Sequence, residues 1–272
     1  MSRKAIMRIS CGIPSKVLRS VFGADRITAM SSFSRVLVAL LATATVWSAG
    51  PSSFKVRVDV SQVPSARPYV EPTKKLVTEW YPKINAILFG KDYPLALKEV
   101  QVIFEPKIYG PDRIDGPAYE EEDVPRSIGR IHVNFSYLER VKYPYPATLI
   151  HELTHVNQQY KNYPDWLNEG MADYVRHAYF EHDIEAKLLP LDGYHFDGKQ
   201  MDQGKFRKQG YLLGYTIAAP FLFWLEQRKD PGLIIALNHA LREGRYHPDI
   251  FQQRCGASLD ALWSEFVAQS SQ

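Results

Sequence analysis

The amino-acid sequence predicts an α+β fold, with a small mixed sheet and a helix first and a mainly helical region after it. Three observations lead to this prediction. Strand-like segments lie before residue 146, apolar residues at helical spacing dominate after it, and stretches rich in Gly and Pro separate the segments. Strands followed by helices are typical of α+β domains.

The first half contains three predicted strands and one predicted helix. Residues 54–60 alternate between apolar and polar side chains, which is typical of a half-buried strand. Residues 100–104 and 131–135 are the second and third predicted strands. Residues 73–89 form an amphipathic helix that ends at Gly90. Its apolar face consists of Leu76, Trp80, Ile84 and Leu88.

The stretch from residue 106 to residue 130 is rich in Gly, Pro and acidic residues and is predicted to be a long loop. Its four acids at 120–123 have the oxygen ligands that calcium needs, although such runs are more often a solvated charged surface. There is no internal repeat. We therefore expect a single domain over residues 51–272, with a sheet lobe at 51–145 and a helical lobe at 146–272.

Residues 1–50 are interpreted as a leader with a signal peptide. Arg35 precedes an apolar run of 12 residues at 36–47, which is too short for a membrane-spanning helix but matches a signal-peptide core. Small residues follow, so cleavage is expected between positions 44 and 52. Met30 is an alternative start. A retained membrane anchor or a buried helix is the competing interpretation of the apolar run.

The basic leader makes the net charge of the full chain positive, although the rest of the chain is mildly acidic. The chain has 33 basic and 30 acidic residues, but 7 basic and 1 acidic residue lie in positions 1–49, which leaves 26 and 29 and a net charge near −3. Such a balance gives no reason to expect nucleic-acid binding. Cys255 is alone after the leader, so no intrachain disulfide is expected in the mature chain, and we expect it to be a buried small apolar residue.

The pattern His-Glu-x-x-His at residues 151–155 is the strongest functional signal. Residues four apart share one face of a helix, so His151 and His155 can bind one metal ion together. Glu152 lies about a quarter turn away, where it can act as a general base on water. An ordinary amphipathic helix with two histidines is the simpler alternative.

A third ligand follows after a short spacer. Catalytic zinc takes three protein ligands, and Glu169 comes 13 residues after His155. Residues 162–164 break the first helix, and Asp165 is a plausible N-cap of the next. Asp173 lies one turn beyond Glu169, where it can accept the free ring N–H of a ligand histidine. A solvated helix face is the alternative interpretation of both acids.

The sequence resembles two groups of peptidases through these residues. The motif at 151–155 followed by Asn168-Glu169 and Asp173 is similar to the gluzincin metallopeptidases, thermolysin among them. Nearly the whole of residues 54–268 resembles the basic secretory protein family of peptidases from plants and bacteria. The segments that carry this second resemblance are 131–134, 151–155, 169–176, Gly214-Tyr215 and 259–266.

These resemblances imply an activity and several site residues. They imply peptide-bond hydrolysis with one Zn²⁺ ion, Asp173 orienting His151 and Asn168 supporting the ligands from behind. The resemblance favours Tyr215 as donor to the oxyanion, with Tyr211 as the second choice. Both are candidates because they lie four apart and are expected to share one helix face. The strand at 131–135 is expected either to be an edge strand that binds substrate or to be an ordinary core strand.

We therefore expect a secreted or periplasmic zinc metallopeptidase that acts on peptides or proteins, a monomer without stable membrane insertion. No Gly-x-Met-x-Asn segment precedes the motif, which favours an endopeptidase over a zinc aminopeptidase. The spacer to Glu169 is shorter than in thermolysin, so a tight connection is expected. A secreted zinc-binding protein without turnover is the alternative from another class. The remaining histidines are interpreted as surface or core residues: His177, His182, His195, His239 and His247.

Overall fold

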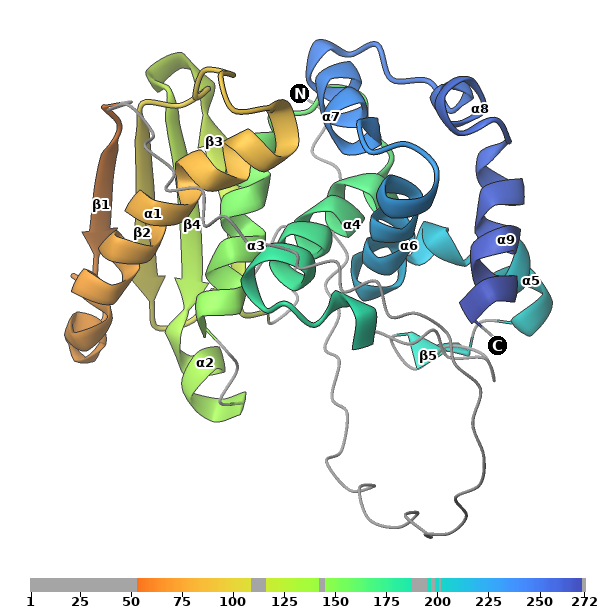
Figure 1. The fold of residues 1–272 in the computed structure, drawn as a ribbon. Coiled ribbons are helices and arrows are strands. Elements are labelled where there is room, and N and C mark those ends of the chain that lie inside the picture. The colour runs from red at the N-terminus through yellow and green to blue at the C-terminus, as the bar shows by residue number, and fades with distance from the viewer. Residues whose placement is uncertain are drawn as a thin grey trace, which may run out of the picture.

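A mixed sheet and a helical half make up the described part of this computed structural model, which covers residues 53–108, 116–141, 145–186, 195–196, 199–200 and 202–270. The sheet lies on one side of the molecule, and the later helices gather on the other (Figure 1). The predicted α+β class is therefore confirmed. The predicted leader at 1–50 lies outside the described residues.

The sheet has the strand order β1-β2-β4-β3. β1 (Lys55–Asp59), β2 (Glu99–Glu105) and β4 (Ile128–Asn134) are parallel, and they match the three predicted strands to within a few residues. β3 (Ala118–Asp123) pairs antiparallel with β4. The prediction of a loop over 106–130 is thus wrong at β3. Pairing with a distant strand stabilises it, and its acidic sequence carries little of the usual strand signal.

The position of β3 also changes the role expected for residues 131–135. β4 lies between β2 and β3, so it is an interior strand, and β3 is the edge strand on that side of the sheet. The expectation that the strand at 131–135 is a substrate-binding edge strand is therefore wrong, and its alternative as a core strand holds. The last residue of that segment, Phe135, already begins helix α2 (Phe135–Val141).

Two helices, α1 (Val70–Phe89) and α3 (Tyr145–Gln158), pack against one face of the sheet (Figure 1). This face is apolar because alternate residues of neighbouring strands point to the same side. Gly129 on β4 lets α3 approach closely, since a Cβ there would lie 2.6 Å from Val156 Cγ1. The buried face consists of Val100, Val102 and Phe104 on β2 and their register partners Gly129, Ile131 and Val133 on β4.

The helical half adds its own apolar side chains to the same hydrophobic core. Trp263 is fully buried there, and its Nε1 donates a hydrogen bond to the carbonyl of Phe206 at 2.7 Å. Cys255 is half-buried against this core, as a small apolar residue. The helices are α4 (Asp165–Val175), α5 (Gln203–Gln209), α6 (Tyr215–Arg228), α7 (Leu233–Glu243), α8 (Asp249–Cys255) and α9 (Leu259–Ser270).

Short elements connect these helices. A π-helical turn, Arg176–Phe180, continues α4, and β5 (His195–Phe196) pairs with β6 (Lys199–Gln200). The 3₁₀ turns are Pro64–Tyr69, Val124–Arg126, Ile184–Ala186 and Gly210–Leu213.

The connection between α3 and α4 is tight, as the short spacer predicts. Gln159 and Asn162 have φ angles of +48° and +52°, and this left-handed backbone ends α3 and reverses the chain. The prediction that Asp165 is the N-cap of the next helix is wrong. Pro164 takes the cap position and Asp165 is the first helical residue. Its carboxylate there still interacts favourably with the positive end of the helix dipole.

The packing of α4 on α6 yields a stability prediction. A Cβ at Gly170 would lie 2.6 Å from the Cβ of Ala218, closer than two side chains can approach. We predict that Gly170→Ala lowers the free energy of unfolding by about 1–2 kcal/mol, because overpacking outweighs the gain in helix propensity. Urea unfolding measures this change. Adding Ala218→Gly should recover part of the loss, and a Gly170→Ala protein as stable as the wild type would contradict the close approach.

Candidate metal centre

Helix α3 places two histidines one turn apart on the face that contacts α4. Leu149, Leu153 and Val156 recur at helical spacing and are buried, which anchors the opposite face of α3. The Nε2 atoms of His151 and His155 lie 3.1 Å from each other. The sequence motif thus brings two imidazole nitrogens to one point.

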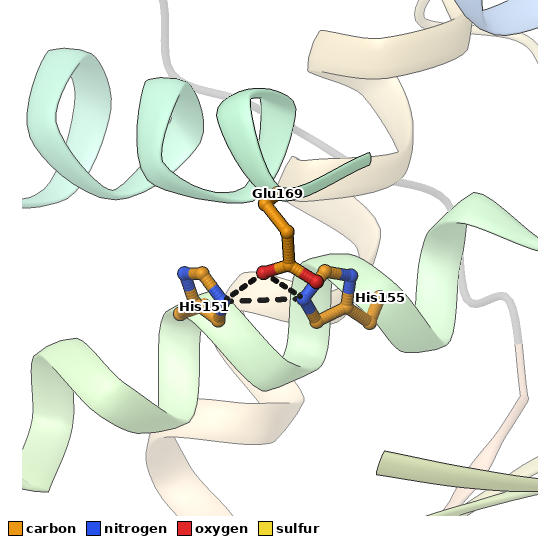
Figure 2. Close-up of side chains that lie close together, drawn as sticks. All are labelled: His151, His155 and Glu169. Atoms are coloured by element: carbon orange, nitrogen blue, oxygen red, sulfur yellow. Dashed lines mark hydrogen bonds and ion pairs between the residues drawn. The ribbon is translucent and has the colours of Figure 1, made fainter. Parts of the chain in front are cut away.

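Glu169 reaches the same point from α4. Its Oε2 lies 3.3 Å from His151 Nε2 and 3.5 Å from His155 Nε2, and Figure 2 shows its carboxylate directed between the two imidazoles. The Glu169 side chain is 8% exposed, and those of His151 and His155 are 13% and 10% exposed. The three side chains therefore form one largely buried cluster of possible metal ligands.

The dimensions of this cluster fit a tetrahedral metal ion. Zinc bonds of about 2.0–2.1 Å to nitrogen and oxygen, at tetrahedral angles, separate neighbouring ligand atoms by about 3.3–3.4 Å. The three separations here are 3.1, 3.3 and 3.5 Å. Two imidazoles and one carboxylate are also a donor set that suits zinc. The residues present therefore fit the ion that the motif predicts.

Asp173 lies behind the first histidine. Its Oδ1 is 2.8 Å from His151 Nδ1, and its side chain is 4% exposed. A carboxylate can only accept here, so Nδ1 carries a proton and Nε2 is the nitrogen left to bind a metal ion. Because Glu169 and Asp173 are one helical turn apart, they can contact the two ring nitrogens of the same histidine, Glu169 at Nε2 and Asp173 at Nδ1.

Gln158 is a site residue that the sequence analysis missed. Its Oε1 lies 2.7 Å from His155 Nδ1, and its Nε2 donates to the carbonyl oxygen of Asn168 at 2.9 Å. The sequence could have indicated it, because the spacing of positions 151, 155 and 158 places all three on one helix face. Asn168 Nδ2 lies 3.3 Å from His155 Nδ1 and 3.5 Å from Glu169 Oε1, so Asn168 is next to both ligands.

The charges in this cluster shift one another. Burial alone would lower the pKa of His151, but its hydrogen bonds to Asp173 and Glu169 and the charges of Asp173 and Glu152 raise that pKa to about 10. Burial would likewise raise the pKa of Glu169, yet the charge of His155 and hydrogen bonds from both histidines hold it well below its usual range. Each histidine thus has carboxylates beside it that favour its protonated form.

Glu152 follows His151 on α3 but is not one of the three clustered ligands. It is buried, at 7% exposure. Its charge contributes to the raised pKa of both His151 and Tyr215, which places the carboxylate within electrostatic reach of the centre. Glu152 therefore lies near the centre, on the helix that carries both histidines.

Tyr215 is the tyrosine that joins the site. Its ring is parallel to that of His151, with 6.0 Å between centroids, and its side chain hydrogen-bonds to Glu169. Burial, followed by the charge of Glu169, raises the pKa of Tyr215 far above its usual value, so the phenol stays protonated. Its φ angle of +44° and that of +68° at Gly214 turn the chain so that α6 begins beside α4.

Tyr211 lies outside the site. Its hydroxyl donates to Asp260 Oδ1 at 2.6 Å, and its ring packs against Trp166 and Trp263. The prediction that Tyr211 and Tyr215 share a helix face is wrong. Tyr211 belongs to a 3₁₀ turn, and the left-handed backbone of Gly214 separates that turn from α6.

A second group of possible ligands is better explained as ion pairs. His177, interpreted from the sequence as a surface or core residue, is buried, and its Nδ1 lies 2.7 Å from Asp183 Oδ1 and 3.2 Å from Glu181 Oε2. A separation of 2.7 Å is that of a hydrogen bond rather than of two ligands on one ion. Arg176 Nε also donates to Glu181 Oε2 at 2.6 Å, so a cation already faces this carboxylate.

The raised pKa of His151 predicts how metal loading depends on pH. A group with a pKa of about 10 is protonated at pH 7, and a cation at Nε2 must displace that proton. We predict that zinc loading at pH 7 releases about one proton or more, and that affinity increases as the pH rises towards 10. Calorimetry in buffers of different ionisation enthalpy measures the release. Asp173→Asn should reduce it, and a binding enthalpy that is the same in all buffers would contradict the prediction.

Comparison with protein families adds to this geometry. The family model described as peptidase of plants and bacteria matches residues 97–266, which run from β2 into α9 and include every residue of the centre. A comparison with curated proteins found no match. The family match covers more than half of the chain and confirms the resemblance to the basic secretory protein family. The chain therefore belongs to the family of peptidases of plants and bacteria.

Proposed function

We propose that this peptidase depends on one zinc ion held by His151, His155 and Glu169. The observation that carries the proposal is the set of three ligand-atom separations, 3.1, 3.3 and 3.5 Å, in a largely buried cluster. Three protein ligands are typical of catalytic zinc, whereas structural zinc usually has four. The same ligand set supports assignment to the gluzincin type of metallopeptidase.

The proposed chemistry is attack of water on a peptide carbonyl. A zinc ion in this centre would supply Lewis acidity, which makes water a nucleophile near neutral pH. Glu152 removes a proton from the attacking water and passes it to the leaving amine. Asp173 holds the proton on His151 Nδ1, which keeps Nε2 available as a ligand.

Tyr215 is the proposed donor to the oxyanion that forms on the substrate carbonyl. Its phenol is buried beside Glu169 and stays protonated because its pKa is raised. A neutral hydroxyl can donate to developing negative charge, and here its proton would turn from Glu169 to the substrate oxygen. The parallel stacking of Tyr215 on His151 supports a fixed position of this ring.

An extended peptide is the substrate that best suits the sheet next to the centre. β3 is an edge strand and packs against α3, the helix that carries His151 and His155. Backbone groups on a strand edge can pair with a peptide in the manner of an added strand. Such pairing uses the backbone of the substrate and needs no free terminus, so it favours an endopeptidase.

The proposal includes a location and an oligomeric state. The basic residue, apolar run and small residues at 35–50 support export to the periplasm or the exterior. Within the described ranges, no helix has the length and apolar character needed to cross a bilayer. We infer that the exported enzyme acts as a monomer, which light scattering of the mature chain tests.

Glu152→Gln tests the zinc-peptidase mechanism. The variant should bind one zinc ion per chain like the wild type but cleave an unfolded protein and N-terminally blocked peptides about 10²–10⁴ times more slowly, because it lacks the general base. Metal analysis and initial rates measure both effects. Glu265→Gln is the matched control, since its carboxylate pairs with Lys229 at the surface. Full activity of Glu152→Gln would refute the mechanism, and cleavage that requires a free N-terminus would indicate an aminopeptidase.

Tyr215→Phe tests the oxyanion donor. Loss of one donor typically lowers kcat by about 10²–10³-fold, whereas the retained ring should keep KM and zinc binding close to wild-type values. Steady-state kinetics separate kcat from KM. Tyr211→Phe is the control, because its hydroxyl contacts Asp260 instead of the centre. If both variants lose the same activity, Tyr215 does not act as a specific donor.

A further inference from the structure

We propose that Gln158 is a positioning residue that selects the metal-binding nitrogen of His155. Gln158 touches neither substrate nor reacting atoms, and it acts through the imidazole. This inference rests on the proposed zinc centre. It assigns to a neutral amide on the second histidine the role that Asp173 has on the first.

The orientation of the Gln158 amide follows from two of its partners, His155 and Asn168. One end of the amide lies 2.9 Å from the carbonyl oxygen of Asn168, which can only accept a hydrogen bond. The NH₂ group must therefore face Asn168. The carbonyl Oε1 is then the atom that lies 2.7 Å from His155 Nδ1. Gln158 is 1% exposed, so water does not compete freely for either contact.

The orientation of the amide determines the tautomer of His155. Because Oε1 has no proton, Nδ1 of His155 must carry one and donate it. In the neutral ring, the lone pair is then on Nε2, which is the atom 3.5 Å from Glu169 Oε2. Asn168 Nδ2 also lies near His155 Nδ1, but at 3.3 Å it is the longer of the two contacts. The shorter contact, with a carbonyl acceptor, decides the proton position.

The same amide connects the two ligand helices. Gln158 is the last residue of α3, and Asn168 directly precedes Glu169 on α4. A contact from His155 through Gln158 to the Asn168 carbonyl therefore joins the second histidine to the backbone next to the carboxylate ligand. Gln158 thus connects the second histidine to the backbone beside the carboxylate ligand.

An arginine from α7 holds the backbone of this residue. Arg242 donates to the carbonyl oxygens of Asn157 and Gln158, at the end of α3 where carbonyls lack partners within the helix. Its guanidinium lies over the ring of Phe89, 3.6 Å from the centroid. The side chain of Gln158 therefore projects from a constrained helix end instead of a fraying one.

The two histidines have different partners as a result. His151 donates to a carboxylate, and His155 donates to a neutral amide. A carboxylate partner raises the basicity of a ligand histidine more than an amide does, because it carries a charge. The centre already buries the three acids Glu152, Glu169 and Asp173. A neutral partner fixes the second ring without adding a fourth buried charge.

The experiment compares zinc affinity and histidine tautomers in three variants. Gln158→Met keeps the length of the side chain but removes its acceptor, and Gln158→Glu keeps an acceptor for His155 Nδ1 but removes the donor to Asn168. Asn157→Leu is the control: this neighbouring amide is equally buried, and its Nδ2 donates within its own helix, to the Leu153 carbonyl. Competition with a chromogenic chelator gives affinity, and ¹⁵N-histidine NMR of the zinc-loaded protein identifies the ligating nitrogen.

The proposal expects a specific pattern. Gln158→Met should bind zinc about 10–100-fold more weakly and lose the single Nδ1–H form of His155, which is the usual scale for losing such a partner. Gln158→Glu should restore affinity to within about threefold of the wild type or better, and Asn157→Leu should leave affinity unchanged. Wild-type affinity in Gln158→Met, or an equal loss in Gln158→Met and Gln158→Glu, would overturn the proposal in favour of a purely structural amide.

Three further outcomes are decisive. If Gln158→Met does not fold, the wild-type spectrum still tests the inference, because ligation of zinc by His155 Nδ1 would overturn it. If the wild type binds no zinc at all, the proposed zinc function fails and this inference fails with it. If the wild type binds zinc and the variants do not follow the pattern, the proposed role of Gln158 is refuted and the proposed zinc function stands.

Discussion

The close approach of α4 to α3 is the constraint on which the rest of the site depends. Metal bonds of about 2 Å tolerate little displacement, so Glu169 can complete the centre only if the two helices are held within a narrow range of distances. Gly170 permits the other side of α4 to press against Ala218 of α6. Gly214 lies against Glu169 itself, since a Cβ at this glycine would lie 3.4 Å from Glu169 Cβ. α4 is thereby held between α3 and α6.

The same approach concentrates charge in the interior. Glu152, Glu169 and Asp173 are all buried, and three buried carboxylates would be costly without compensating positive charge. In the metal-free protein the histidines supply it, which is why the pKa of His151 is raised to about 10 while that of Glu169 is held low. A divalent cation can replace those protons without leaving the carboxylates uncompensated. The requirements for a stable interior and for metal binding thus coincide.

Much of the fold and site could be predicted from particular residues. The alternation in β1 and the helical spacing in α1 reflect local periodicities, and the fold class follows from the order of such elements. β3 was missed because its stability comes from pairing with β4, a non-local contact that its acidic sequence does not signal. Asp165 was misassigned because whether a cap forms depends on backbone angles at Pro164, and composition alone does not reveal these.

The sequence by itself determined which groups share a helix face: His151 with His155, and Glu169 with Asp173. The period of 3.6 residues is a property of the backbone and needs no tertiary contact. Only the tertiary structure decided between Tyr215 and Tyr211, because the left-handed backbone at Gly214 sends one ring to His151 and leaves the other on Asp260. It also decided the role of Gln158, since the orientation of an amide depends on the carbonyl that α4 brings to it.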